Sequence, residues 1–463
     1  MGPYLLIIAA FFMTFGGAPM SSFLPEDPLV TVLCTLLALC LAPVPAAVFA
    51  RWVYRKVFSN TLHLHRRKYA LFRSLCGLFI LADFAAMIYL LGWPSFVDDS
   101  LGLAQLVTYE RLVHFPPIAL LLVVNHLIKI LPFLIMLLMA WVPMYRVDLA
   151  VRHGRWGLAD YVLFNLRQYV LFLLVPFCVL LLIEDTWIVF PLDLRDRMTA
   201  SGAIYVINGA LIVLALVFLP LLLRFVWKTQ PFPAGALRTR LEELLVRTRL
   251  RCRQILLWET YGGQMVNACV TGFVHVTRYI LITDSLIAAL EPDEILAVFA
   301  HEIAHVKRHH FIYYAMFALG FIPIALLPVD AVGRLPAGEV FASLWGIVMA
   351  ALYWGVLFGY ISRRLELEAD LYAINLLGGV FDFVNALEKL SLASGRARTA
   401  GSWRHFSIAR RVDLITGTLG NPGAALALHR QVRLAKALCI LLAATAVLGM
   451  LFFPGLMVKA LLS

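Results

Sequence analysis

Long apolar runs are the feature of this sequence that most restricts its fold. Each run is long enough to cross a bilayer core about 30 Å thick as a helix. Hydrophobic residues make up 62% of the 463 residues and charged residues only 14%, which is far from the composition of a soluble domain. We therefore predict a multi-spanning α-helical membrane protein with about nine spans. The runs are at 3–23, 28–50, 70–93, 116–143, 168–184, 203–227, 312–328, 340–362 and 437–458.

The loops between these runs differ in charge, and the difference predicts orientation. The loop at 51–69 carries six Lys or Arg residues and no acidic one, and 144–167 is also basic, whereas 98–110 carries three acidic residues. Basic loops stay on the cytoplasmic side of a membrane. Alternation of the spans then places the two long polar segments, 228–311 and 363–436, in the cytoplasm, where we expect one small α+β domain. This bias accounts for the net charge of +11, and we expect no nucleic-acid partner.

The predicted organisation has five parts in chain order. They are an N-terminal membrane region of about six spans at 1–227, the first half of the polar domain at 228–311, two spans at 312–362, its second half at 363–436 and a last span at 437–463. The richness in Arg, Ala and Leu favours a bacterial inner membrane. In a eukaryotic host we would expect a membrane of the ER type.

One short motif, His301-Glu302-Ile303-Ala304-His305, carries metal-binding chemistry. Residues four apart lie on the same face of a helix, so both imidazoles can reach one zinc ion. Glu302 is offset by about 100° and can instead take a proton from a water molecule whose pKa zinc lowers toward about 7. The seven cysteines form no C-x-x-C pair and are expected to be small buried side chains. The alternative interpretation is two surface histidines at the end of a helix.

A catalytic zinc site needs a third protein ligand and an open coordination position. Glu366 and Asp370 follow a predicted span that returns the chain to the same side of the membrane, and they are also four residues apart. One carboxylate can bind the metal while the other fixes the tautomer of a histidine ligand. Glu368 is expected to face solvent, and His309 and His310 to be polar residues at a helix end without a metal role.

The motif pair H-E-x-x-H and E-x-x-x-D, with two apolar spans between, resembles the integral-membrane zinc metalloproteases that include the type-1 CAAX prenyl endoprotease and the heat-shock protease HtpX. The stretch 267–272 resembles the family's N-A-x-x-x-G motif, and 272–286 looks closest to the prenyl-protease branch. His405 and Arg411 match a histidine and an arginine that this branch places six apart. The resemblance covers residues 235–415. Phe406 departs from it, because the branch usually has a proline there.

The resemblance implies one zinc ion per chain and a role for each matching residue. The metal ligands would be His301, His305 and Glu366, and Glu302 would be the general base. Asp370 would orient a ligand. His405 and Arg411 would stabilise the oxyanion. A cation or donor near developing negative charge lowers the barrier. The alternative for His405 and Arg411 is a basic loop that faces phospholipid headgroups, since other arginines surround them in the sequence.

A stretch upstream of the zinc motif is expected to bind substrate, through Asn267, Ala268, Cys269 and Gly272. An edge strand beside the metal can pair with an extended peptide by main-chain hydrogen bonds. An ordinary structural strand is the alternative, and the two are compatible.

We therefore predict a zinc metalloendopeptidase that hydrolyses peptide bonds of membrane-associated proteins or peptides. The prenyl-protease branch implies C-terminal prenylated tails as substrates, whereas the HtpX branch implies misfolded or regulatory membrane proteins. Ionisable residues within the apolar runs, such as Asp83, His126, Lys129 and Glu184, leave a transporter or channel as an alternative. A non-catalytic scaffold with a structural zinc site is another, and an intramembrane site-2 protease is a third. The sequence does not predict an oligomeric state.

Overall fold

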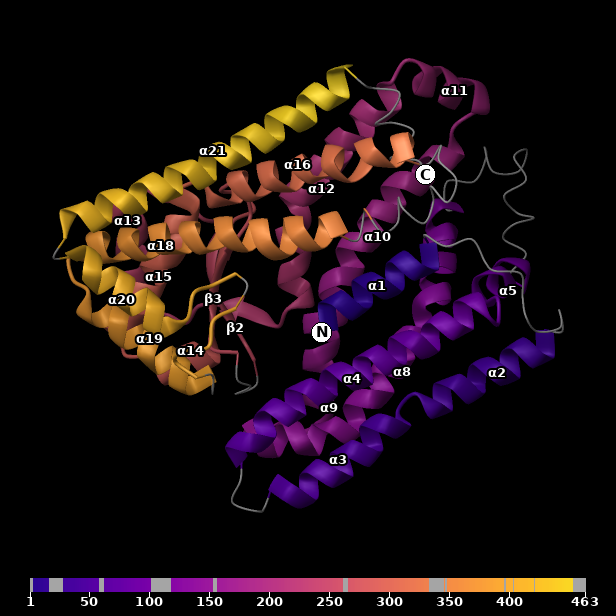
Figure 1. Cartoon of the computed structure of the whole chain (residues 1–463), viewed down its shortest axis with the longest axis horizontal. Coiled ribbons are helices and arrows are strands. Elements are labelled where there is room, and N and C mark those ends of the chain that lie inside the picture. Colours follow the sequence, from indigo (N-terminus) through magenta and orange to yellow (C-terminus); the bar gives the residue numbers. More distant parts are fainter. Residues whose placement is uncertain are drawn as a thin grey trace. The chain divides into compact units, whose positions relative to one another are not determined.

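The protein is described by a computed structural model, which is mostly helical with one small sheet (Figure 1). The residues it describes are 3–15, 28–57, 62–100, 118–152, 156–260, 265–332, 345, 348–394, 397–402, 404–419 and 421–452. The chain divides into two compact units, each taken separately below. Unit 1 comprises Met1–Thr229 with Trp258–Gln264, and unit 2 comprises Gln230–Leu257 with Met265–Ser463.

Unit 1 is a set of apolar helices. Its helices are α1 (Pro3–Phe15), α2 (Pro28–Leu41), α3 (Val44–Val57), α4 (Leu62–Tyr89), α5 (Trp93–Ser100), α8 (Ile118–Arg152), α9 (Leu158–Asn165), the π-helix η1 (Leu166–Leu171), α10 (Phe172–Asp185), the 3₁₀ helix η2 (Thr186–Val189), α11 (Leu192–Ala200) and α12 (Ala203–Val226). Helix α8 continues through Pro132 and Pro143, so the chain does not break near Pro132. Apolar packing around a long helix allows it to absorb an internal proline.

Six helices in the described part of the chain are long and apolar enough to cross a membrane. They are Pro28–Arg55, Leu71–Tyr89, Leu120–Leu149, Leu158–Asp185, Val206–Val226 and Pro422–Gly449. The predicted multi-spanning helical architecture is confirmed. The count of about nine spans stays a prediction, because the predicted spans at 3–23 and 340–362 lie partly outside the described residues. The predicted span at 312–328 lies in a helix whose apolar stretch, His310–Phe321, is shorter than a candidate span.

Ionisable residues on the apolar helices of unit 1 form pairs between helices. Lys129 on α8 lies 2.8 Å from a carboxylate oxygen of Asp98 on α5, and Asn125 donates to the same carboxylate at 2.7 Å. His126 lies 3.6 Å from Asp185 of α10. Pairing of this kind reduces the cost of placing charge among apolar helices.

Unit 2 contains the sheet, a four-stranded one in the order β1-β2-β4-β3. Its strands are β1 (Thr229–Pro231), β2 (Gln254–Trp258), β3 (Ala268–Thr271) and β4 (Tyr279–Thr283). Strand β4 is buried along its whole length, as its run of β-branched and aromatic residues favours. Strand β3 lies at the edge and pairs antiparallel with β4, with Val270 opposite Ile280.

The helices of unit 2 pack on this sheet and on one another. They are α13 (Ala236–Arg247), α14 (Asp284–Ala289), α15 (Pro292–Lys307), α16 (His310–Val332), the π-helix η3 (Ala351–Leu357), α18 (Phe358–Leu377), α19 (Phe381–Ser394), α20 (Ile408–Leu419) and α21 (Pro422–Phe452). Helix α15 contacts α18, α19 and β3, and α21 runs along α16 and α18 (Figure 1).

One apolar core holds α15 in place. Phe299 and Ile303 of α15 are fully buried in the same cluster as Ile280 and Ile282 of β4 and Phe383 of α19. Full burial of each such side chain stabilises the fold by about 1.5–3 kcal/mol. These contacts fix the rotation of α15 about its axis, and with it the direction in which its polar residues point.

Helix α15 has clear start and stop signals. Pro292 occupies the first turn, and the Glu294 carboxylate accepts a hydrogen bond from the backbone N–H of Glu291 at 2.8 Å, as in a capping box. The helix ends at Lys307 with Arg308 as its C-cap, and His309 adopts a left-handed conformation with φ of 59°. Helix α16 then begins at His310. The zinc-motif helix and the next apolar helix are therefore separate.

Candidate active site

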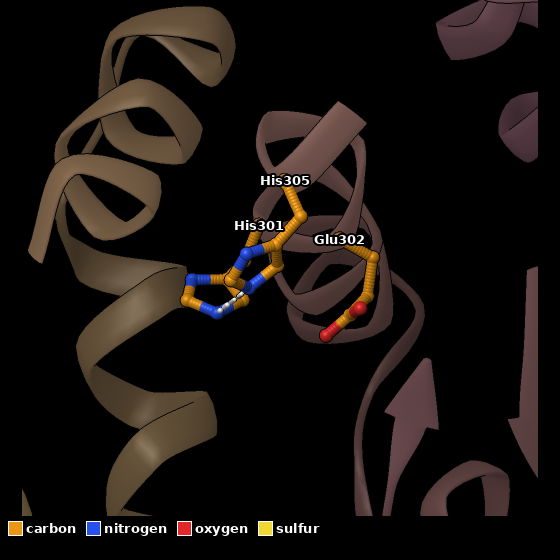
Figure 2. Close-up of side chains that lie close together, drawn as sticks. All are labelled: His301, Glu302 and His305. Carbon is orange, nitrogen blue, oxygen red and sulfur yellow. Dashed lines mark hydrogen bonds between the residues drawn. The ribbon is translucent and has the colours of Figure 1, made fainter. Parts of the chain in front are cut away.

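Two histidines and a glutamate of α15 gather at one point (Figure 2). The Nε2 atoms of His301 and His305 lie 3.3 Å apart, as the four-residue spacing predicts. A ligand atom of Glu302 lies within 4.8 Å of both imidazoles. The motif of the sequence is therefore assembled on one side of the helix.

Helix α18 brings a carboxylate to the same point from more than sixty residues further along the chain. The Glu366 oxygens lie 3.5 Å from Nε2 of His301 and 3.8 Å from Nε2 of His305. Small buried residues on both helices, Ala300 and Ala304 on α15 and Ala369 on α18, allow this close approach.

The two imidazoles have the spacing of neighbouring ligands in a tetrahedral metal site, and the Glu366 carboxylate lies beside both. Metal–ligand bonds of about 2.0–2.1 Å at tetrahedral angles separate neighbouring ligand atoms by about 3.3–3.4 Å. The two Nε2 atoms are 3.3 Å apart, and one Glu366 oxygen lies 3.5 Å from His301 while the other lies 3.8 Å from His305. Two imidazoles and one carboxylate are a donor set that binds divalent metals. The residues present thus fit a metal ion, with a fourth position left for a further ligand.

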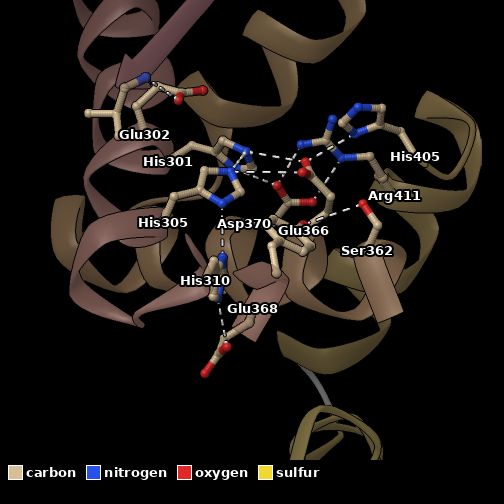
Figure 3. A network of polar contacts seen from close by, with 12 residues as sticks. His301, Glu302, His305, His310, Ser362, Glu366, Glu368, Asp370, His405 and Arg411 are labelled. Atoms are coloured by element: carbon tan, nitrogen blue, oxygen red, sulfur yellow. Dashed lines mark hydrogen bonds and ion pairs between the residues drawn. The ribbon is translucent and has the colours of Figure 1, made fainter. Parts of the chain in front are cut away.

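Asp370 fixes the orientation of His301. Its Oδ1 lies 2.9 Å from Nδ1 of His301, and the Arg411 guanidinium binds both of its oxygens through Nε and Nη2 (Figure 3). Burial disfavours the anionic form of Asp370, but Arg411 and His301 outweigh it and lower its pKa. The carboxylate is therefore ionised and accepts from Nδ1–H, which leaves the Nε2 lone pair for a metal.

Glu302 has the protonation behaviour of a general base. Burial raises the pKa of its carboxyl to about 7, near the pH at which a base works best. Its Oε2 accepts a hydrogen bond of 3.2 Å from the backbone N–H of Val270 on β3. The base therefore lies between the histidines and the edge strand.

His405 reaches the site from the loop before α20. Its Nδ1 lies 3.1 Å from Glu366 Oε2, and its side chain is 44% exposed, whereas that of Arg411 is 13% exposed. Two hydrogen bonds close the loop: the Ser402 N–H donates to the His405 carbonyl at 2.9 Å, and the His405 N–H donates to the Ser402 hydroxyl at 3.0 Å. Of the two predicted oxyanion stabilisers, His405 lies on the exposed side of the site, whereas the Arg411 guanidinium is bound to Asp370.

The predicted substrate stretch forms β3 and its two ends. Asn267 is tied to Thr283, since its N–H donates to the Thr283 hydroxyl at 3.1 Å and its carbonyl accepts from the Thr283 N–H at 3.1 Å. Gly272 has φ of 94°, and a Cβ there would collide with the carbonyl of Thr277, so only glycine allows the chain to turn here. Burial raises the pKa of the Cys269 thiol, which keeps it neutral and unsuited to bind a metal.

The comparisons with known proteins place the catalytic segment in a family. Residues 231–419 match the model of Peptidase family M48. The match covers the segment that carries both motifs. The resemblance inferred from the two motifs is thereby confirmed.

Relatives of the M48 segment include members of both branches named by the resemblance. A protease HtpX homolog of Aeropyrum pernix is 24% identical over 220 residues, 44% of this chain and 67% of the relative. A second, of Thermoplasma acidophilum, is 31% identical over 32% of this chain and 48% of its own length. A CAAX prenyl protease 1 homolog of Arabidopsis thaliana is 28% identical over 35% of this chain and 42% of its own. The match thus spans about half the length of several of these relatives.

A solved structure has a similar fold. The crystal structure of S. mikatae Ste24p aligns with a TM-score of 0.50 at 16% identity, covering 86% of this chain and 99% of that one. The similarity in fold reaches well beyond the M48 segment.

Two further residues of the M48 segment belong to the polar network that the sequence did not predict. His310 is fully buried, and its Nδ1 lies 2.9 Å from Nδ1 of His305. Its Nε2 lies 2.9 Å from Glu368, whose side chain is only 12% exposed. The expectations that His310 is a polar helix end and that Glu368 faces solvent were wrong. On a continuous helix His310 would lie about 140° around the axis from His305, and only the left-handed turn at His309 brings it back.

Proposed function

We propose that this protein is a zinc-dependent membrane endopeptidase that hydrolyses peptide bonds of membrane-associated proteins or peptides. The observation that carries the proposal is the convergence of His301, His305 and Glu366 within 3.8 Å of one another, with the Glu302 carboxylate beside the two imidazoles. Zinc suits this nitrogen and oxygen donor set, and one ion per chain is expected.

Bound at these three ligands, zinc would supply a Lewis acid that polarises the peptide carbonyl and makes water acidic near neutral pH. Glu302 would take the proton from the attacking water and return it to the leaving amine. Asp370, held by Arg411, keeps His301 in the ligating tautomer. His405, on the exposed side, is placed to donate a hydrogen bond to the developing oxyanion.

The outer edge of β3 is the proposed binding site for an extended substrate. Successive residues of an antiparallel strand alternate in direction, and Val270 directs its N–H away from β4, toward Glu302. Ala268, two residues earlier, has the same direction. A peptide that pairs with these residues would place its backbone beside the metal ligands. Asn267 and Gly272 fix the two ends of the strand.

Substrate identity and location are proposed from the membrane context. The segments 228–311 and 363–436 would form the catalytic domain at the cytoplasmic face, in a bacterial inner membrane. There, misfolded or regulatory membrane proteins are the proposed substrates, whereas prenylated C-terminal tails are proposed only for a eukaryotic host.

Replacing the base tests the proposal. The Glu302→Gln variant should retain its zinc and lower the rate of cleavage by about 10²–10⁴-fold, because general-base catalysis contributes that much. The substrates are found by comparing membrane proteomes of cells that carry wild type or variant, since they should accumulate in the variant. Glu243→Gln, an exposed glutamate of α13, is the matched control.

A transporter would keep its flux in the Glu302→Gln variant, and a scaffold would leave the membrane proteome unchanged. Either result, with zinc bound at one ion per chain in both proteins, would contradict the proposed peptidase.

A further inference from the structure

We propose that His310 is a positioning residue for the metal centre, and that through Glu368 it makes metal affinity depend on Lys436 of helix α21. The inference rests on the proposed metal site but not on the chemistry that follows binding. It assigns a role to the buried His310 and to the partly buried Glu368 and Lys436, which the proposed mechanism does not use.

Four side chains form an unbroken line of short contacts, and Figure 3 shows three of them, His305, His310 and Glu368. Nδ1 of His305 lies 2.9 Å from Nδ1 of His310, and Nε2 of His310 lies 2.9 Å from Glu368 Oε2. The Lys436 ammonium lies 2.7 Å from Oε2 and 2.9 Å from Oε1 of Glu368. Both ring nitrogens of His310 are thus engaged, and its side chain is 0% exposed.

The direction of each hydrogen bond follows from the metal ligand. His305 can bind a metal through Nε2 only if that nitrogen carries a lone pair, so its proton is on Nδ1. Nδ1–H then donates to Nδ1 of His310, which must be the acceptor. His310 therefore carries its own proton on Nε2 and donates it to Glu368. A single arrangement of protons satisfies the whole line, and it is the one that directs the His305 lone pair at the metal.

The backbone is shaped to make this contact. His309 adopts the left-handed conformation that non-glycine residues rarely take. It separates α15 from α16 and rotates His310 back beneath His305. A strained turn at this point is explained if the position of His310 is needed.

Lys436 connects the line to α21. In addition to both oxygens of Glu368, its ammonium lies 3.4 Å from the carbonyl of Arg308, the C-cap residue of the zinc-motif helix. A cation at a helix C-terminus interacts favourably with the free carbonyls there. Helix α21 contains one of the candidate membrane spans, Pro422–Gly449. The position of this membrane helix therefore bears on both the ligand His305 and the end of the helix that carries it.

Zinc affinity of the full-length protein in detergent tests the role of His310. The His310→Leu variant should bind zinc about 10–100-fold more weakly in chelator competition, which is the usual cost of losing a residue that orients a ligand. The absorption spectrum of the cobalt-substituted protein should also change, because His305 would tilt. His310→Gln keeps one acceptor and one donor, and should recover part of the affinity. His309→Asn, at the neighbouring exposed histidine, should leave zinc affinity unchanged.

The Glu368→Gln and Lys436→Met variants test the contacts beyond His310. Each should weaken zinc binding less than His310→Leu does, whereas Arg433→Met, at an exposed cation of α21, should have no effect. These milder variants also decide the matter if His310→Leu does not fold.

Two results would overturn the inference. One is an unchanged zinc affinity and cobalt spectrum in His310→Leu and Glu368→Gln while the metal-free proteins melt at lower temperature, because that describes a purely structural role. The other is equal loss in His309→Asn and His310→Leu. If wild type binds no zinc, the proposed function fails as well. If wild type binds zinc but the Glu302→Gln variant shows no loss of cleavage, the proposed function fails and this inference stands.

Discussion

The two histidines proposed as metal ligands have different neighbours. Nδ1 of His301 lies 2.9 Å from the buried carboxylate of Asp370, and two guanidinium nitrogens of Arg411 bind that carboxylate. His305 donates to a neutral imidazole, and the carboxylate of Glu368 with its lysine comes one step later. A carboxylate in direct contact attracts a proton to its histidine far more strongly than a second imidazole does.

The difference is visible in the metal-free protonation of the two ligands. Burial disfavours the charged form of His301, but the hydrogen bonds to Asp370 and Glu366 outweigh it and raise its pKa to about 10. Burial lowers the pKa of His305 to about 3. One ligand is therefore a cation and the other neutral at pH 7, although both come from one turn of the same helix.

Removing the direct support should have the largest effect. Asp370→Ala leaves the Arg411 guanidinium buried without its partner, which costs about 3–5 kcal/mol when a buried ion pair is broken. We expect a lower melting temperature of the metal-free protein and a zinc affinity reduced more than in His310→Leu. Asp382→Ala, at an exposed aspartate of α19, is the control. An equal effect of Asp370→Ala and His310→Leu on zinc affinity would contradict the ranking of the two supports.

The pH dependence of zinc binding should report the charged ligand. His301, with its pKa at about 10, must lose one proton to bind the metal, so affinity should rise about tenfold per pH unit between pH 7.5 and 9. His305 is already neutral there and contributes no slope. The measurement is zinc affinity against pH, together with the proton released on binding. Asp370→Asn should flatten this rise, because the proton on His301 is then held less tightly. A slope that persists in Asp370→Asn would speak against His301 as its source.

Replacing Arg411 by lysine and Lys436 by arginine should have the smallest effects on zinc binding, and the two effects should differ in size. Arg411 binds both oxygens of Asp370 in a planar fork, and lysine cannot reproduce that geometry. Lys436 acts on Glu368 as a point charge, and arginine can supply the same charge. We expect Arg411→Lys to shorten the lifetime of bound zinc in the presence of a chelator by several-fold more than Lys436→Arg does. The reverse order would mean that α21 is held to the metal centre by geometry and not by charge.

The sequence predicted the support of His301 because its parts follow helical periodicity. Glu366 and Asp370 are four residues apart on α18, and that spacing alone suggested one ligand and one orienting carboxylate. The His305 support could not be predicted in this way. It depends on a left-handed residue at His309 that no glycine or asparagine signals, and on Lys436, which lies 68 residues beyond Glu368.

The fold shows the same division. Strand β4 and the start of α15 follow from local signals, because the β-branched run ending at Thr283 and the proline at 292 act locally. The end of α15 does not, because neither its C-cap Arg308 nor the left-handed His309 is a residue that usually breaks a helix. Helix α8 likewise passes through Pro132, since its neighbours and not its own sequence decide whether it continues.

The hydrogen bond from the Val270 amide to Glu302 has a consequence for the order of events. A peptide that adds itself to the outer edge of β3 needs the same amide as its own donor. Docking would displace the carboxylate from its resting partner and leave it free for the attacking water at the moment when a scissile bond is present. Such a peptidase would be inactive without substrate, because binding of the substrate strand itself releases the Glu302 carboxylate that acts as general base.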